Sequence, residues 1–153
     1  MTQHPSSHRG DGNRIPVGPL EFRTPLRYLF APAERSCLEG RFSYSTVDPY
    51  AVRLDLILNV DIEVTWFVSR ELLAAGLTTP SGDGDFRAWP SIGPQRDQFY
   101  FSMQRLDGQA TFETSLPAVR QWLDLTYQVV PAGDEALWFD WDATIADLLW
   151  PLN

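Results

Sequence analysis

The chain has 153 residues, a hydrophobic share of 44% and a formal charge of −8, which suits one domain with a core and excludes global disorder. Its twelve basic residues are all arginine and are outnumbered by twenty carboxylates. This balance argues against nucleic-acid binding, which draws much of its affinity from a basic face. The single cysteine, Cys37, excludes an intrachain disulfide and fits a reducing compartment.

Residues 1–18 hold both histidines, His4 and His8, and almost nothing to bury. We therefore expect a flexible tail over residues 1–18, followed by a single domain over residues 19–153. No segment has the apolar region of a secretory signal or the ~18 apolar residues that a membrane span needs. The expected location is the cytoplasm.

An alternation of apolar and charged residues from Leu20 predicts a strand with one buried face. Because Pro25 cannot donate a ladder hydrogen bond, this strand should lie at an edge or carry a bulge. Phe42 and Tyr44 continue the pattern in a second segment. The apolar positions of the first segment are Leu20, Phe22, Leu26, Tyr28 and Phe30, and its charged positions are Glu21, Arg23 and Arg27.

Two apolar runs at even positions, 52–58 and 62–68, predict a hairpin. A three-residue turn at Asn59–Asp61 keeps both arms on one core face and places Leu54 opposite Trp66. Val60 and Ile62 lie at the tip, where apolar side chains are costly if they are only solvated. We expect a second copy or a partner protein to cover them.

A short helix over residues 70–75 follows, with Ser69 as its N-cap and Gly76 as the left-handed residue that ends it. A turn segment then leads into a short strand over residues 85–90. A second hairpin brings a run of Phe99, Phe101 and Met103 against Phe112 and Leu116 across a two-residue turn at Asp107 and Gly108.

The period lengthens after Ser115, where a helical stripe runs to Val130 and is stopped by Pro131 and Gly133. Asp142 is predicted to open a last helix that carries Ile145, Leu148 and Leu149. Strands joined by tight turns imply antiparallel pairing, so the predicted fold class is α+β.

The chain offers little for catalysis. Both histidines lie in the tail, lysine is absent, and no histidine of the domain can activate Cys37, which we expect to be inert. We therefore expect no enzyme activity, no metal and no cofactor.

Two pairs of carboxylates allow more than one interpretation. Asp83 and Asp85 could hold a cation, but no glutamate follows at EF-hand spacing, so a glycine-aspartate turn is preferred. Asp140 and Asp142 stand among aromatic residues and could act on a wall glycan. The preferred interpretation is that Asp142 is a helix N-cap.

Several tryptophans lie near element ends, where core packing and an interface role are both open. Tryptophan and arginine dominate protein interfaces, and this chain is rich in both without a catalytic set. The candidate interface residues are Val60, Ile62, Trp89, Trp138 and Trp141.

Three segments combine uncommon residues at fixed separations. The first holds Tyr44 and the run Asp48-Pro49-Tyr50-Ala51-Val52; the second holds Trp66, Arg70-Glu71-Leu72-Leu73 and Gly76-Leu77; the third holds Pro80, Gly82, Gly84-Asp85, Arg87 and Trp89-Pro90. A weaker match covers Phe139-Asp140, Asp142 and Leu148-Leu149. From about Phe42 to the C-terminus, the chain resembles the SsgA-like family of actinobacterial sporulation and cell-division proteins.

The resemblance implies a non-enzymatic adaptor that helps to position the septum, including the FtsZ ring, and the septal wall machinery during sporulation. It also implies recruitment to the division septum, a homotrimer, and a whirly-like fold of two antiparallel sheets with flanking helices. Whirly relatives bind single-stranded nucleic acid, which is the alternative function that the acidic balance opposes. The matching residues are better explained as fold determinants, so no functional residue is carried over.

Overall fold

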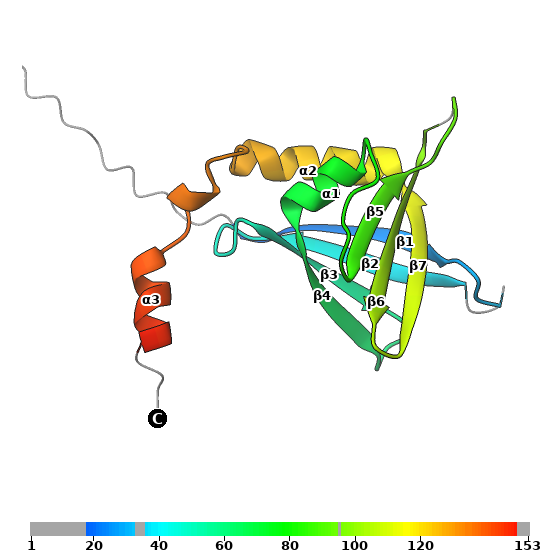
Figure 1. Cartoon of the computed structure of the whole chain (residues 1–153), viewed down its shortest axis with the longest axis horizontal. Helices are drawn as coiled ribbons and strands as arrows, with labels where there is room; N and C mark the ends of the chain where they lie inside the picture. The colour runs from blue at the N-terminus through cyan, green and yellow to red at the C-terminus, as the bar shows by residue number, and fades with distance from the viewer. Residues whose placement is uncertain (1–17, 33–35, 95, 150–153) are drawn as a thin grey trace, which may run out of the picture.

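The computed structural model describes residues 18–32, 36–94 and 96–149 (Figure 1). The predicted tail therefore lies outside the described residues, apart from the exposed Gly18. In the described part, four strands, a short helix, three more strands and the C-terminal helices follow one another. This order matches the one predicted from the sequence.

The first two strands, β1 (Leu20–Tyr28) and β2 (Cys37–Tyr44), pair antiparallel, with Phe22 opposite Phe42. Their even-numbered residues face the core, as the alternation predicted. The prediction for Phe30 was wrong. The strand ends before it, and Phe30 lies in a turn with a φ of 69° and is 97% exposed.

The next two strands, β3 (Ala51–Ile57) and β4 (Glu63–Ser69), form the predicted hairpin. Leu54 lies opposite Trp66, and the backbone N–H of Leu58 donates to the carbonyl of Ile62 at 3.0 Å. The three-residue turn is therefore confirmed, and it keeps both arms of the hairpin on one face of the sheet.

Helix α1 (Arg70–Gly76) begins at its predicted cap, since the Ser69 hydroxyl accepts from the Leu72 amide at 3.2 Å. The prediction that Gly76 is left-handed was wrong: its φ is not positive, and Leu77 beyond it is right-handed. Glycine is needed here for a different reason. A Cβ at position 76 would lie 2.6 Å from the Cβ of Ala88 in the neighbouring strand.

Substitution Gly76→Ala should therefore lower the free energy of unfolding by about 1–2 kcal/mol, because overpacking outweighs the better helix propensity of alanine. Gly84→Ala is the matched control, since a Cβ there meets no atom within 4 Å and φ is unstrained. Urea unfolding of both variants checks the prediction. Equal stability of Gly76→Ala and the wild type would mean that α1 and its neighbour strand separate at little cost.

Strands β5 (Phe86–Pro90), β6 (Gln98–Arg105) and β7 (Gly108–Ser115) form an antiparallel meander. A two-residue turn joins β6 to β7, as predicted, but it is formed by Leu106 and Asp107 rather than by Asp107 and Gly108. The shift places Phe101 directly opposite Phe112, and their rings stack with centroids 5.4 Å apart. Aromatic packing therefore sets this register.

Helix α2 (Leu116–Val129) is capped by Ser115 and ends before Pro131, as predicted. A short 3₁₀ helix, η2 (Glu135–Leu137), and helix α3 (Trp141–Leu149) follow. The prediction that Asp142 caps the last helix was wrong. Asp140 takes this role, because its carboxylate accepts from the Ala143 amide at 3.0 Å and the helix begins directly after it.

All seven strands join one antiparallel sheet in the order β4-β3-β2-β1-β7-β6-β5, which confirms the α+β class. The two sheets that the resemblance implied are thus continuous, because Arg27 and Tyr28 at the end of β1 pair with β7. At Pro25, strands β1 and β7 no longer form backbone pairs, and the Thr114 hydroxyl donates to the Pro25 carbonyl at 3.2 Å. Pro25 therefore faces a locally unpaired side of β1, as its missing N–H requires.

The sheet curls so that its two halves face each other across the core. Phe42 of β2 meets the edge of Phe101 of β6 at 6.3 Å. Trp122 of α2 lies between the halves at one end, with its ring 5.8 Å from that of Phe42. Figure 1 shows α2 lying across this end of the sheet, whereas α3 projects away from it.

Candidate protein-interaction surfaces

The tip of the β3–β4 hairpin holds two of the predicted interface residues. Val60 is fully exposed, and Ile62 is 49% exposed. The Asn59 side-chain oxygen accepts from the amides of Asp61 and Ile62 at 2.9 and 3.0 Å. Because this turn fixes the local backbone, the tip presents its apolar side chains in a defined position.

The three predicted tryptophans lie elsewhere. Trp89 is half-buried on β5 and stacks on Tyr100 at 5.9 Å, and Trp138 is half-buried against the core. Trp141 is 54% exposed at the start of α3. The structure therefore does not bring the five candidate residues to one place, and it gives Trp138 a role in core packing.

The carboxylates do not gather into a site. Asp83, Asp85 and Asp142 are exposed, and Asp140 is engaged in capping α3. Across residues 18–32, 36–94 and 96–149, no three His, Cys, Asp or Glu side chains come together as a metal ion would require. Cys37 is exposed at the start of β2.

Helix α3 carries an exposed apolar stripe. The sequence predicted the helix and its apolar residues but did not predict that they are exposed. Ile145, Leu148 and Leu149 are 49%, 76% and 69% exposed, and Trp141 continues the same stripe. A ring contact of 6.1 Å between Phe139 and Tyr50 lies just before the helix. Within the described residues the stripe is therefore largely exposed, and it can meet another molecule.

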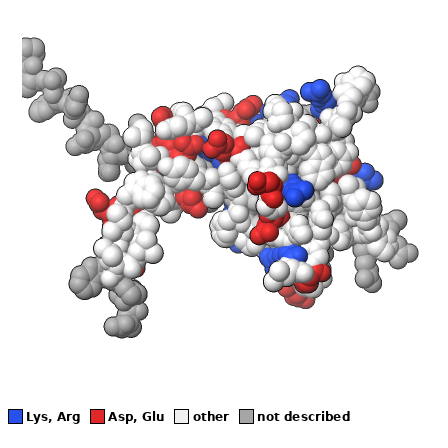
Figure 2. All heavy atoms as spheres, viewed as in Figure 1, with Lys and Arg blue, Asp and Glu red and all other residues white. Residues whose placement is uncertain are grey.

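A groove of about 920 Å³ lies between Trp66 of β4, the loop that leads into β5, and the β6–β7 turn. We call it the Trp66 groove. Trp66 is half-buried along it, and the Arg105 guanidinium sits over the Trp66 ring at 4.8 Å. Leu106 at the β6–β7 turn is fully exposed at the rim. Figure 2 shows acidic and basic side chains scattered over the visible face, with no continuous basic patch.

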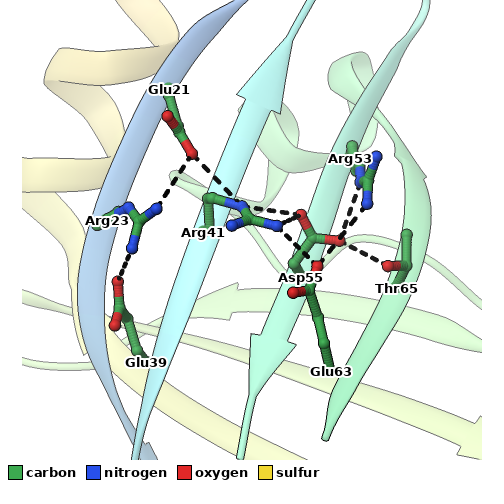
Figure 3. Close-up of polar contacts among 8 residues, drawn as sticks. All are labelled: Glu21, Arg23, Glu39, Arg41, Arg53, Asp55, Glu63 and Thr65. Carbon is green, nitrogen blue, oxygen red and sulfur yellow. Dashed lines mark hydrogen bonds and ion pairs between the residues drawn. The ribbon is translucent and has the colours of Figure 1, made fainter. Parts of the chain in front are cut away.

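The outer face of β1–β4 carries a network of ion pairs centred on Asp55 (Figure 3). Arg41 and Arg53 both donate to this carboxylate at 2.9 Å, and the Thr65 hydroxyl donates at 2.6 Å. Burial raises the pKa of Asp55, but the hydrogen bonds from Thr65, Arg53 and Arg41 outweigh it and lower the pKa overall. The network continues through Glu21, Arg23, Glu39 and Glu63.

Sequence reasoning missed this network, although a signal for it existed. Its charged members all lie at odd-numbered positions of the four strands, opposite in parity to the even-numbered core positions. The shared parity places them on one face of the sheet. Cross-strand charge pairing could therefore have been predicted from the same alternation that predicted the core.

A buried arginine ties α1 to the C-terminal end of α2. Arg70 is 1% exposed, and its guanidinium donates to the carbonyls of Thr126 and Val130 at 3.1 and 2.9 Å and to Glu135 at 2.9 Å. It also lies over the ring of Tyr127 at 4.0 Å. We call this set of contacts the Arg70 clamp.

The clamp changes the chemistry of its neighbours. Hydrogen bonding from its own backbone amide, assisted by Arg70, lowers the pKa of Glu135. Burial raises the pKa of Tyr44, on the other side of the guanidinium, to about 12, and its hydroxyl donates to the Pro49 carbonyl at 3.0 Å. Both groups therefore hold one protonation state near neutral pH, which is a structural property rather than that of an acid-base catalyst.

The profile of the SsgA family, described as Streptomyces sporulation and cell division protein, matches residues 38–135, which is most of the described domain. The chain belongs to the SsgA family. The matched region includes the hairpin tip, the Trp66 groove and the Arg70 clamp, and it ends before α3. The chain is thus a protein of sporulation and cell division.

Relatives in the family agree with this assignment. The sporulation-specific cell division protein SsgB of Thermobifida fusca is 38% identical over 112 residues, covering 73% of this chain and 81% of that protein. The protein of the same name from Streptomyces coelicolor is 35% identical over 124 residues, covering 81% and 90%.

Solved structures of SsgA family members share the fold. An SsgA-like sporulation-specific cell division protein from Thermobifida fusca superposes with a TM-score of 0.73 at 33% identity, covering 86% of this chain and 96% of that one. A structure described with SsgB mutations that correlate with longitudinal division in Streptomyces coelicolor gives a TM-score of 0.72 at 31% identity, covering 80% and 96%. Among the described helices, none combines the length and hydrophobicity that crossing a bilayer requires.

Proposed function

We propose that this chain is a non-enzymatic adaptor that helps to position the septum, through the FtsZ ring and the septal wall machinery, in sporulation-specific division. The adaptor works from the cytoplasm and is recruited to the division septum. Its contacts with division proteins are made by exposed apolar side chains rather than by a catalytic site. Val60, Ile62 and Trp141 belong to these contacts. Trp89 contributes to them only through the exposed side of the ring pair that it forms with Tyr100.

One observation carries the proposal. The domain exposes large apolar side chains at three separate places, the hairpin tip, the α3 stripe and the rim of the Trp66 groove, on a chain with a charge of −8. Exposed apolar surface is costly unless another molecule covers it. The buried charged residues of the described part, Asp55 and Arg70, are by contrast taken up in the ion-pair network and in the Arg70 clamp.

Co-purification from a sporulating culture tests the proposal. The tagged full chain should recover FtsZ or septal wall proteins, and the fused fluorescent protein should appear at septa. Recovery of no division protein by a chain that is folded and expressed would contradict the adaptor function. A catalytic role would instead predict a substrate that is consumed without a stable complex.

We further propose that the chain forms a homotrimer through the hairpin tip. The double variant Val60→Asp and Ile62→Asp should then reduce the mass measured by light scattering to that of a single chain, because charges replace the buried apolar contact. Ile92→Asp is the matched control, since Ile92 is 99% exposed and lies outside the tip. A wild-type mass in the double variant would exclude the tip as the interface.

Single-stranded nucleic acid is not expected to bind. On the outer face, Arg23, Arg41 and Arg53 are each held by carboxylates, so they do not form a free basic row. A labelled single-stranded oligonucleotide should show no change in fluorescence anisotropy even at low salt, where electrostatic binding is strongest. Saturable binding that weakens with added salt would contradict this expectation.

A further inference from the structure

The two edges of the sheet are protected differently. At β5, Ser81 exchanges backbone hydrogen bonds of 2.9 and 3.0 Å with Ala88, and Pro90 ends the strand. β4 lies at the other edge, and within the described residues no backbone hydrogen bond is made on its outer side. An exposed strand edge is a template for pairing with another chain, so proteins normally cover it or place charges along it.

The register identifies the unpaired groups. The Leu58 amide donates to Ile62 and the Arg70 amide donates to Tyr50, so the even-numbered residues of β4 bond to β3. In an antiparallel pair, the residues between them point their N–H and C=O groups away from the partner strand. The groups that face the open edge therefore belong to Glu63, Thr65 and Phe67.

The side chains beside this edge differ on the two faces. Val64 and Trp66 point to the inner face. Trp66 lines the Trp66 groove, and both side chains line a second cavity of about 320 Å³ between β3–β4 and β6–β7. Phe67 points to the outer face and is 68% exposed. Because side chains alternate along a strand, a strand added to β4 would place every second side chain in the groove and the others beside Phe67.

The charges around the edge limit what can bind. Asp83, Asp85 and Asp107 line the Trp66 groove. Two arginines oppose these three carboxylates, and one of them, Arg105, already lies over Trp66. The acidic excess favours an occupant with basic side chains.

We propose that the β4 edge binds an extended peptide segment of a partner protein, with apolar side chains at alternate positions and lysine or arginine next to them. The segment adds a strand to the sheet, and its main chain pairs with Glu63, Thr65 and Phe67. This proposal rests on the adaptor function and specifies the chemistry of the partner segment. Main-chain pairing supplies affinity, while the groove and Phe67 select the sequence.

The test removes one edge donor without disturbing the fold. Phe67→Pro deletes an N–H that β3 does not use, and proline is tolerated on the solvent side of an edge strand. Phe67→Val is the matched control, because it keeps the N–H and the strand propensity and loses only the ring. The probe is a phage-displayed library of random peptides, selected on the wild-type full chain.

Selected peptides should alternate apolar and polar residues, carry positive charge, and bind Phe67→Val modestly more weakly than the wild type, since only the ring contact is lost. They should bind Phe67→Pro about tenfold more weakly than Phe67→Val or worse, since a main-chain hydrogen bond is lost as well. In the wild type, binding should slow hydrogen exchange at the Thr65 and Phe67 amides, a measurement that does not depend on the variant folding. Equal binding by all three chains, unchanged exchange at these amides, or no enriched peptide would overturn the proposal.

Two further outcomes separate this proposal from the adaptor function. If Phe67→Pro recovers the same division proteins as the wild type from a sporulating culture, the adaptor function stands and the β4 site is excluded. If Phe67→Pro instead lowers the mass of the protein alone in light scattering, a second copy occupies the edge and the peptide proposal fails. Loss of the division proteins by Phe67→Pro, together with their recovery by Phe67→Val, supports both the adaptor function and the peptide site at the β4 edge.

Discussion

Substitution Arg70→Ala is expected to lower the free energy of unfolding by about 3–5 kcal/mol, the largest effect of the single changes considered for this domain. The variant leaves the carbonyls of Thr126 and Val130 without their donor, and it leaves Glu135 without its counter-charge in a half-buried position. It also opens a cavity beneath the Tyr127 ring. Thr126 and Val130 are fully buried, so solvation does not recover the cost of their lost hydrogen bonds.

Two further variants make this result specific. Arg70→Lys should lose most of the same stability, because one ammonium group cannot reproduce the planar fork that reaches two carbonyls and a carboxylate. Arg120→Ala, on the exposed side of α2, should leave the melting temperature unchanged. Thermal unfolding followed by circular dichroism measures all three. A stable Arg70→Ala protein would mean that α1 and the end of α2 are held together by apolar packing alone.

Substitution Asp55→Asn is expected to lower the free energy of unfolding by about 2–3 kcal/mol near neutral pH. The side chain of Asp55 is 1% exposed, whereas Arg41 and Arg53 are 21% and 48% exposed. When the carboxylate is lost, both guanidinium groups can therefore recover some hydration, which keeps the cost below that of a fully buried pair. The remaining amide can accept from Thr65 but cannot balance two positive charges.

The pH dependence of Asp55→Asn follows from the direction of the pKa shift. The pKa of Asp55 is lowered in the folded chain, so its contribution is complete above the unfolded value of about 3.9 and is lost as the pH falls through the folded pKa. The difference in stability between wild type and Asp55→Asn should be constant above about pH 4 and shrink below it. Urea unfolding across this range measures it.

An exposed pair from the same network serves as the control for Asp55. Glu39→Gln breaks a pair with Arg23 in which both side chains are about half exposed, so it should change the free energy of unfolding little. The loss of stability below about pH 4 should be the same as in the wild type. If Asp55→Asn and Glu39→Gln behave alike, the network would be a surface feature without a buried centre.

Much of the fold was predictable because strand parity and turn length constrain each other. The even-numbered core positions of β3 and β4 required the three-residue turn at Asn59–Asp61, and the structure has this turn. The β6–β7 turn had the predicted length but was shifted by one residue. Turn chemistry alone could not place it, since the stacking of Phe101 on Phe112 decides the register.

One of the errors comes from contact between segments distant in sequence, and another comes from an alternation that outlasts its strand. Gly76 was assigned a local backbone role, yet it is required by Ala88 of β5. Phe30 continued the alternation of β1, but the strand had already ended. Local patterns indicate which face a residue occupies and give no information on what lies against that face.

The candidate surfaces show the same limit. Val60 was correctly placed at an exposed tip because turn residues extend beyond the sheet. Trp89 and Trp138 could not be assigned to core or surface, because element ends occur in both. Phe67 and the open β4 edge were not predicted at all. An edge is a property of strand order, which alternation within one strand does not encode.

The narrow seam between β1 and β7 has a consequence for how the chain folds. On either side of the seam, every strand pairs with its neighbour in sequence, so each half of the sheet can form from short-range contacts. Among the described strands, the pairing between residues far apart along the chain is that of Arg27 with Glu113 and of Tyr28 with Phe112. Closing a long loop is slow relative to forming hairpins. The two meanders should therefore form early, and the rate-limiting step should be their docking through Phe42 and Phe101.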